Sequence, residues 1–137
     1  MKAKGVNRVI IAVKDIDEAT KRYSDLLGIS FWDAGIQEEY GVHASISWEG
    51  GLELIMPLDS NSAIAKYLDR HGEGLYGVAF KVTDIDRAAT AAKDKNVRIT
   101  GEIDEDQSGR FHMYRELVLH PADTGGILML LVQTKPK

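Results

Sequence analysis

One phrase occurs twice in this chain of 137 residues, and that repeat limits the folds open to it. "VNRVIIAVKDIDEA" fills residues 6–19, and "LYGVAFKVTDIDRA" fills residues 75–88. In both copies alternating apolar residues lead into an aspartate, which is the pattern of a strand running into a capped helix. A chain that repeats a strand–helix unit is predicted to form two similar modules that pack as a pair.

The two repeated helices carry their own start and stop signals. In the first copy Asp15 stands at the N-cap position, Glu18 follows three residues on, and Gly28 favours a left-handed stop. The second copy has Asp84 as its cap and Asn96 at its end. Both helices are therefore predicted from local sequence alone.

Strand-like segments follow each helix. They cover roughly 29–35, 42–48 and 51–57 in the first half, and roughly 97–103, 111–120 and 126–133 in the second. Each half is then a βαβββ module, and the modules span about residues 5–58 and 74–134. Neither module has enough apolar core to stand alone comfortably, so we predict one α+β domain over residues 1–137.

The stretch "SNSAIAKYLDRHG" lies between the two modules. It predicts a connecting helix over about residues 62–71, with Ser60 or Ser62 as its N-cap and Gly72 as its stop. No linker of low complexity separates the halves, which agrees with a single domain.

Composition and charge exclude several classes of protein. Hydrophobic residues make up 44% and charged residues 28%, as in ordinary globular domains. The absence of cysteine rules out disulfides, thiolate metal ligands and a cysteine nucleophile. With a net charge of -4 and no basic cluster, no nucleic-acid partner is expected. No apolar run approaches the roughly 18 residues of a membrane span, and no signal-peptide pattern is present, so we expect a cytoplasmic protein without a membrane partner.

Four phrases carry a family resemblance that runs nearly from end to end. They are "IAVKDIDEA", "LELIMPLDSNSAIAKYL", "GEGLYGVAFKV" and "LHPADTGGILMLLV". With the tandem modules, they resemble the vicinal oxygen chelate superfamily of glyoxalases, extradiol dioxygenases and bleomycin-resistance proteins. Within it they are most similar to the methylmalonyl-CoA epimerases. The resemblance implies a glyoxalase-like fold: an open, barrel-like sheet with helices outside and a small-molecule ligand in its cleft. It also implies a homodimer.

The resemblance further implies four metal-ligating positions, where the epimerases carry His, Gln or Glu, His, and Glu. This chain has Arg8, Glu53, Gly77 and Leu130 at those positions. Arginine does not coordinate a cation, glycine has no side chain, and leucine has no donor atom. We therefore predict neither the family's metal nor another cofactor. Of the family's two proton-transferring carboxylates, one corresponds to Glu39 and the other is lost at Leu130.

Alternation along the strands suggests which side chains line the cleft. Arg8 and Glu53 should share one face. The third strand has an apolar set that is predicted to meet the helix, namely Val42, Ala44, Ile46 and Trp48. His43 and Ser45 would then line the cleft. For residues 111–120 two inward-facing sets stay open: Met113, Arg115 and Leu117, or His112, Tyr114 and Glu116.

These positions predict a metal-independent enzyme, an isomerase, epimerase or lyase that abstracts a proton next to a carbonyl in a small oxygenated or carboxylated metabolite. The catalytic candidates, which would move the proton, are Glu39, His43 and Glu53. The substrate-binding candidates are Arg8, Ser45, Tyr114 and Arg115. Arg8 would stabilise the oxyanion, because a guanidinium supplies a fixed positive charge and a planar fork of donors.

Three alternatives stay open beside that prediction. In the first alternative, Arg8 and Glu53 only neutralise each other as a buried pair without further function. In the second alternative, the cleft sequesters a small molecule without catalysing a reaction, as bleomycin-resistance proteins do. An aromatic content of 7% and a cationic Arg8 argue against that for a cationic drug. Overall phrase similarity alone suggests the third alternative, an enzyme of CoA thioesters.

Overall fold

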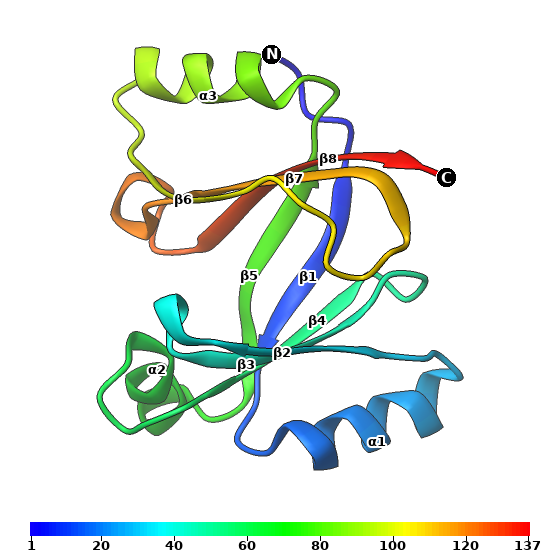
Figure 1. Cartoon of the computed structure of the whole chain (residues 1–137). Coiled ribbons are helices and arrows are strands. Elements are labelled where there is room, and N and C mark those ends of the chain that lie inside the picture. Colours follow the sequence, from blue (N-terminus) through cyan, green and yellow to red (C-terminus); the bar gives the residue numbers. More distant parts are fainter. The chain divides into compact units, whose positions relative to one another are not determined.

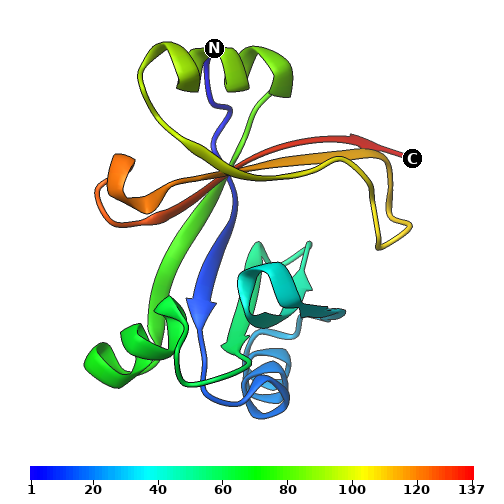
Figure 2. The ribbon, with the colours of Figure 1, turned by 60° about the vertical axis from the view of Figure 1, so that its left-hand side comes forward.

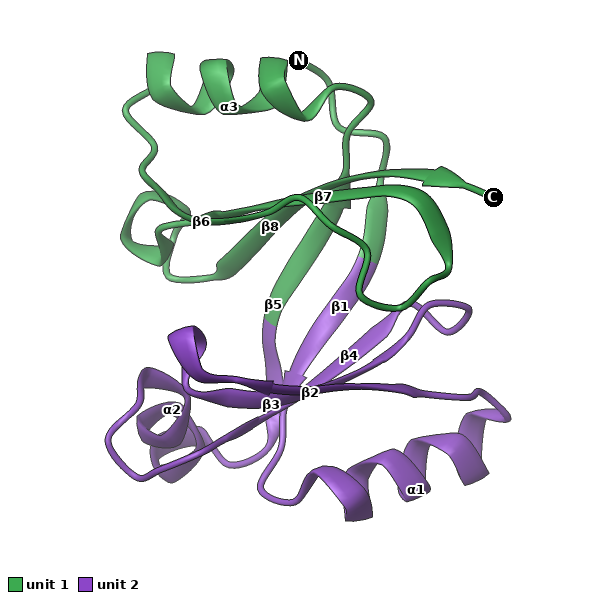
Figure 3. Ribbon diagram, viewed as in Figure 1, with its two compact units in different colours: residues 1–7, 77–137 green, residues 8–76 purple.

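A computed structural model describes all residues, 1–137, as eight strands and three α-helices (Figure 1). The chain divides into two compact units, coloured in Figure 3: unit 2 is Arg8–Tyr76, and unit 1 is Met1–Asn7 with Gly77–Lys137. The boundaries fall inside β1 (Val6–Ala12) and β5 (Gly74–Lys81), the two repeated strands. The α+β class is confirmed, and that the two units make one domain stays a prediction.

None of the helices is both long and apolar enough to cross a membrane.

Unit 2 is a four-stranded sheet with a helix along one face. Its elements after β1 are α1 (Ile16–Leu27), β2 (Trp32–Gln37), a 3-10 helix (Glu38–Tyr40), β3 (Val42–Ser47), β4 (Leu52–Pro57) and α2 (Ala63–His71). The strands lie in the order β2-β3-β4-β1, with β1 parallel to β4 and the other pairs antiparallel. The predicted βαβββ order is confirmed.

The helix ends of unit 2 follow the local signals in the sequence. The Asp15 carboxylate accepts a hydrogen bond from the Glu18 backbone N–H at 3.0 Å, and Gly28 closes α1 with a φ of 66°. Ser62, rather than Ser60, caps α2, because its Oγ accepts from the Ala65 N–H at 3.2 Å. The apolar core between α1 and the sheet consists of Val13, Ile16, Ala19, Leu52 and Leu54.

Unit 1 repeats this plan. Its elements after β5 are α3 (Ile85–Asp94), β6 (Ile99–Ile103), β7 (Phe111–Leu119), a 3-10 helix (Pro121–Asp123) and β8 (Leu128–Pro136), with the strands in the order β5-β8-β7-β6. In Figure 2 α3 stays on one side of β6, β7 and β8. The Asp84 carboxylate caps α3 by accepting from two backbone N–H groups, and Asn96 follows the helix with a φ of 60°. Both signals were predicted.

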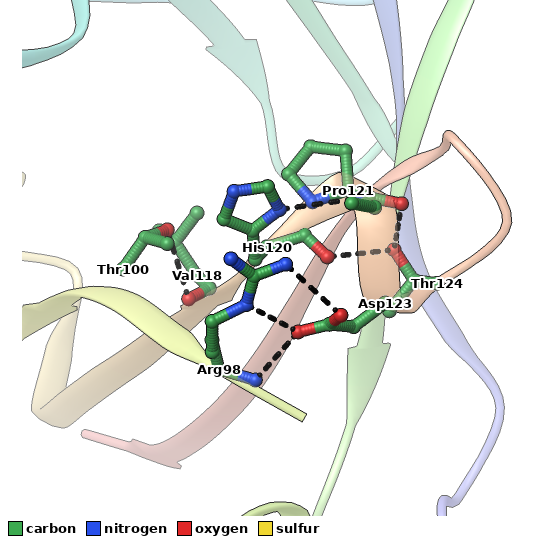
Figure 4. Close-up of polar contacts among 8 residues, drawn as sticks. Arg98, Thr100, Val118, His120, Pro121, Asp123 and Thr124 are labelled. Atoms are coloured by element: carbon green, nitrogen blue, oxygen red, sulfur yellow. Dashed lines mark hydrogen bonds and ion pairs between the residues drawn. The ribbon is translucent and has the colours of Figure 1, made fainter. Parts of the chain in front are cut away.

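The turn between β7 and β8 is closed by an ion pair (Figure 4). The Arg98 guanidinium donates to both carboxylate oxygens of Asp123, at 2.9 and 3.1 Å, and the Arg98 backbone N–H donates to the same carboxylate. These contacts lower the pKa of Asp123 to about 2. His120 has a structural contact here, because its Nδ1 accepts from the Ala122 N–H at 3.0 Å.

Candidate functional site

The two faces of the unit 2 sheet are told apart by their contacts with α1. Val9 and Ile11 of β1, with Leu52 and Leu54 of β4, belong to the core beneath that helix. Their neighbours along each strand point the other way, since successive side chains alternate between the faces of a sheet. Arg8 and Glu53 therefore lie on the face opposite α1, as the sequence predicts.

Arg8 and Glu53 form a buried ion pair on that face. The Arg8 Nε donates to Glu53 Oε1 at 2.6 Å, and the side chains are only 2% and 12% exposed. The Arg8 guanidinium carbon lies 5.2 Å from the ring centroid of Trp48, within the range of a cation–π interaction. The Trp48 ring stacks in turn on Trp32, at 6.3 Å between centroids and 25° between planes. The Arg8 guanidinium is thus a fixed positive charge that is largely shielded from water.

The prediction of which β3 side chains line the cleft is wrong, because the two alternating sets of side chains are exchanged between the faces of the sheet. In the observed register Ser45 lies opposite Leu54 of β4, which faces α1, and Ile46 lies opposite Glu53. His43 and Ser45 are therefore on the α1 side, while Ile46 shares the face of Glu53. The sequence predicts the polar set on the cleft side because the apolar set of β3 is expected to meet the helix. A strand's own alternation does not say which set faces the helix, and pairing with the neighbouring strand decides it.

His43 and Ser45 have local partners on the α1 side of the sheet. The His43 Nε2 lies 2.8 Å from Oδ1 of Asp33 on the edge strand β2. This hydrogen bond, helped by one from the Gly35 N–H, lowers the pKa of Asp33. The Ser45 hydroxyl donates to the Trp32 backbone oxygen at 3.4 Å. The structure therefore does not bring these two side chains together with Arg8 and Glu53.

Glu39 lies in the 3-10 helix Glu38–Tyr40 and is exposed to solvent. Its carboxylate is thus in a different environment from the buried carboxylate of Glu53. Glu39 lacks the shielding from water that Glu53 has. Its assignment as a catalytic residue stays a prediction.

In unit 1 the structure decides between the two sets left open for β7. Leu117 and Leu119 belong to the core beneath α3, and Arg115 on the same side pairs with Asp86 of that helix at 3.0 Å. Tyr114 and Glu116 are therefore on the face opposite α3. Of the two sets left open, the one with Arg115 thus lies on the α3 side, and the assignment of Arg115 as a substrate-binding residue stays a prediction.

Tyr114 and Glu116 form a second buried polar pair. The Tyr114 phenol donates to Glu116 Oε1 at 2.6 Å, and the two residues are 7% and 6% exposed. Tyr114 was among the predicted ligand-binding residues, whereas Glu116 was not. The available signal was a carboxylate directly before the apolar run Leu117–Leu119. A charged residue inside a buried strand is rare enough to be a candidate on that ground alone.

The residues at the family's metal positions do not fit a metal ion. Glu53 is paired with Arg8, and Leu130 is a buried apolar side chain. A Cβ atom on Gly77 would lie 2.4 Å from the Leu128 backbone oxygen, so a ligating side chain has no room there. No group of three or more His, Cys, Asp and Glu side chains in the chain is arranged to hold a metal ion.

Residues 7–114 match the Glyoxalase/Bleomycin resistance protein/Dioxygenase superfamily, and the chain belongs to that superfamily. Among its relatives, the mitochondrial methylmalonyl-CoA epimerase of Bos taurus is 34% identical over 131 residues, which cover 93% of this chain and 73% of the relative. The crystal structure of methylmalonyl-CoA epimerase from Mycobacterium tuberculosis has a TM-score of 0.77 at 32% identity, covering 98% of this chain and 90% of that one. The Streptomyces coelicolor methylmalonyl-CoA epimerase in complex with 2-nitronate-propionyl-CoA has a TM-score of 0.74 at 29% identity, covering 96% and 98%. The predicted resemblance is confirmed.

Proposed function

We propose that this protein is an isomerase that moves the proton on a carbon next to a carbonyl group, with Arg8 acting where the resemblance implies a metal. The observation that supports the proposal is the buried Arg8–Glu53 ion pair, because Arg8 stands at a position where the resemblance implies a metal ligand. End-to-end similarity to methylmalonyl-CoA epimerases supports the reaction class. It also favours a carboxylated acyl-CoA thioester over the other small metabolites considered.

Proton abstraction next to a carbonyl group requires stabilisation of the negative charge that forms on the carbonyl oxygen. A general base binds the proton as the C–H bond breaks, and the electron pair of that bond moves into the carbonyl and forms an enolate, whose oxygen carries the charge. A guanidinium held in advance by Glu53 and Trp48 needs little reorganisation to donate to that oxygen. Glu53 orients the cation, and the proposal gives it no step of its own.

Epimerisation and α-proton exchange test this function directly. We expect the protein to epimerise methylmalonyl-CoA, or a related carboxylated acyl-CoA, and to exchange the α-proton for deuterium in D2O, followed by NMR. Arg8→Leu should lower kcat/KM roughly ten- to a hundredfold, the cost of a lost charge-assisted hydrogen bond. Arg22→Leu removes an exposed arginine of the same unit and serves as the control. No epimerisation or exchange across such a panel would refute the proposal.

Metal independence is the finer part of the proposal. We expect substoichiometric divalent metal in purified protein by elemental analysis, with turnover and melting temperature unchanged after treatment with a chelator. The physical reason is that one carboxylate already paired with Arg8 does not hold a divalent ion against water. A stoichiometric ion released by the chelator together with activity would contradict this part.

Assembly and location also belong to the proposal. A homodimer is expected from the resemblance, and sedimentation at micromolar concentrations checks it. A single species of 15.1 kDa would contradict the dimer. A cytoplasmic location rests on the sequence pattern alone and stays a prediction.

A further inference from the structure

The two tryptophans of the chain, Trp32 and Trp48, both lie at the ion pair of unit 2. The Arg8 guanidinium carbon lies over the Trp48 ring, 5.2 Å from its centroid, and Trp48 stacks on Trp32 at 6.3 Å between centroids. Ile46 of β3 lies opposite both Trp32 and Glu53, so these side chains share the sheet face opposite α1. The cation, its carboxylate and the two rings thus form one contiguous group, and all four residues belong to unit 2.

Glu53 and Trp48 contact different parts of the Arg8 guanidinium. Glu53 accepts a hydrogen bond from Nε at 2.6 Å, a contact at one edge of the planar group. That hydrogen bond fixes the edge, but the plane can still turn about the line from Nε to the carboxylate oxygen. Turning moves the guanidinium carbon, and Trp48 opposes the movement because the attraction falls as the cation leaves the ring. Together the two contacts set the direction in which the terminal nitrogens of Arg8 point.

The equivalent places in unit 1 have neither indole. In β7 the residue opposite the position on β8 where the resemblance implies a metal ligand is Val118. Val118 pairs with Gly101 of β6, so Gly101 stands where unit 2 has Trp32. His120, two residues beyond Val118, stands where unit 2 has Trp48. A βαβββ module therefore forms without an indole at either place, and both indoles occur in the unit that has the buried guanidinium.

We propose that Trp48 is a positioning residue that aims Arg8 at the enolate oxygen, and that Trp32 supports Trp48; this inference rests on the proposed function. The negative charge on that oxygen forms only as the C–H bond breaks. A correctly aimed cation therefore stabilises the transition state more than the bound substrate. In this role Trp48 acts through Arg8 and takes no part in the proton transfer itself. Its loss should lower kcat and have a smaller effect on KM.

The first arm of the test compares Trp48→Leu with Trp48→Phe in the epimerisation of methylmalonyl-CoA. Trp48→Leu removes the aromatic ring, so kcat should fall roughly 5- to 30-fold, the range for a cation–π contact shielded from water. Trp48→Phe keeps an aromatic ring and should retain much of kcat. Tyr67→Leu is the control and should keep wild-type kcat, because it removes another aromatic ring of unit 2, one that contacts His71 and Tyr76. Wild-type kcat in Trp48→Leu, or equal kcat in the two Trp48 variants, would overturn the inference and leave the proposed function standing. No epimerisation by the wild type would refute both.

The second arm needs no substrate and measures how firmly the guanidinium is held. In ¹⁵N-labelled protein the buried Nε–H of Arg8 should give an NMR signal that exchanges slowly with water, and Arg8→Lys assigns the signal by removing it. Trp48→Leu should make this exchange roughly 5- to 30-fold faster, because the guanidinium loses the ring that opposes its movement. Trp32→Leu should also speed the exchange, by a smaller factor, and it carries the test if Trp48→Leu does not fold. Exchange as slow as in the wild type would overturn the role of the indole that was removed.

Discussion

The two units are built from the same phrase and differ at the positions that bear charge. In unit 2, β1 presents Arg8 and β4 presents Glu53 on the face opposite the helix. At the corresponding places of unit 1, β5 has Gly77 and β8 has Leu130. Unit 1 instead has its buried carboxylate on β7, at Glu116.

The difference shows which features the fold itself requires. Both units keep a capping aspartate, an apolar core beneath one helix and a parallel pair formed by their first and last strands. Those features recur because either βαβββ module needs them to bury its apolar side chains. The buried charged groups do not recur, so a βαβββ module can form without them at these positions.

The largest expected effect is on the ion pair of unit 2. Arg8→Leu leaves the buried Glu53 carboxylate without the guanidinium, so the free energy of unfolding should fall by about 3–5 kcal/mol. Arg8→Leu with Glu53→Gln should recover most of that loss but not turnover. Urea denaturation measures the first and the epimerisation assay the second. Full activity in a stable double variant would end the case for Arg8 as the substitute for a metal.

At the matching place in unit 1 the comparison predicts a steric effect. Gly77→Ala would bring a methyl carbon to 2.4 Å from the Leu128 oxygen, and overpacking of this kind costs about 1–3 kcal/mol. Gly74→Ala in the same strand is the control, because its Cβ would stand 3.6 Å from the Tyr67 hydroxyl, an ordinary contact. Equal stability of the two variants in urea would show that β5 can move away from β8.

The shared helix caps should respond alike. Asp15→Ala and Asp84→Ala each remove a carboxylate that accepts backbone N–H groups at a helix start, and each should cost about 1 kcal/mol. Asparagine at either position should stay close to the wild type, because it caps nearly as well. A cost at only one of the two positions in thermal unfolding would break the equivalence of the two copies.

The smallest effect is expected in acid. The Arg98 contacts hold the pKa of Asp123 at about 2, below its ordinary value of 3.8. The folded-state pKa is the lower one, so the contribution of Asp123 to stability is full above pH 4 and is lost as the pH falls toward 2. Asp123→Asn should flatten that part of the stability profile. Asp33→Asn, in unit 2, is the comparison, since His43 lowers the pKa of that carboxyl as well. An unchanged profile in Asp123→Asn would contradict the assignment.

Much of the fold followed from local patterns in the sequence. The caps at Asp15, Ser62 and Asp84 are confirmed, since a cap depends on residues within one turn of it. The strand positions were predicted to within a few residues from alternation. The face shared by Arg8 and Glu53 was also predicted, because the family resemblance places both at ligand positions.

What the sequence determined is the order of elements and their caps, because each depends on neighbouring residues. Only the tertiary structure decided which sets of side chains face away from the helices. In the structure His43 and Arg115 lie on the helix sides of their sheets. Glu116 lies with Tyr114 on the sheet face opposite α3. The physical reason is that alternation has a period of two and divides a strand into two sets. Only pairing with a distant strand, and packing of one sheet face against a helix, says which set is which.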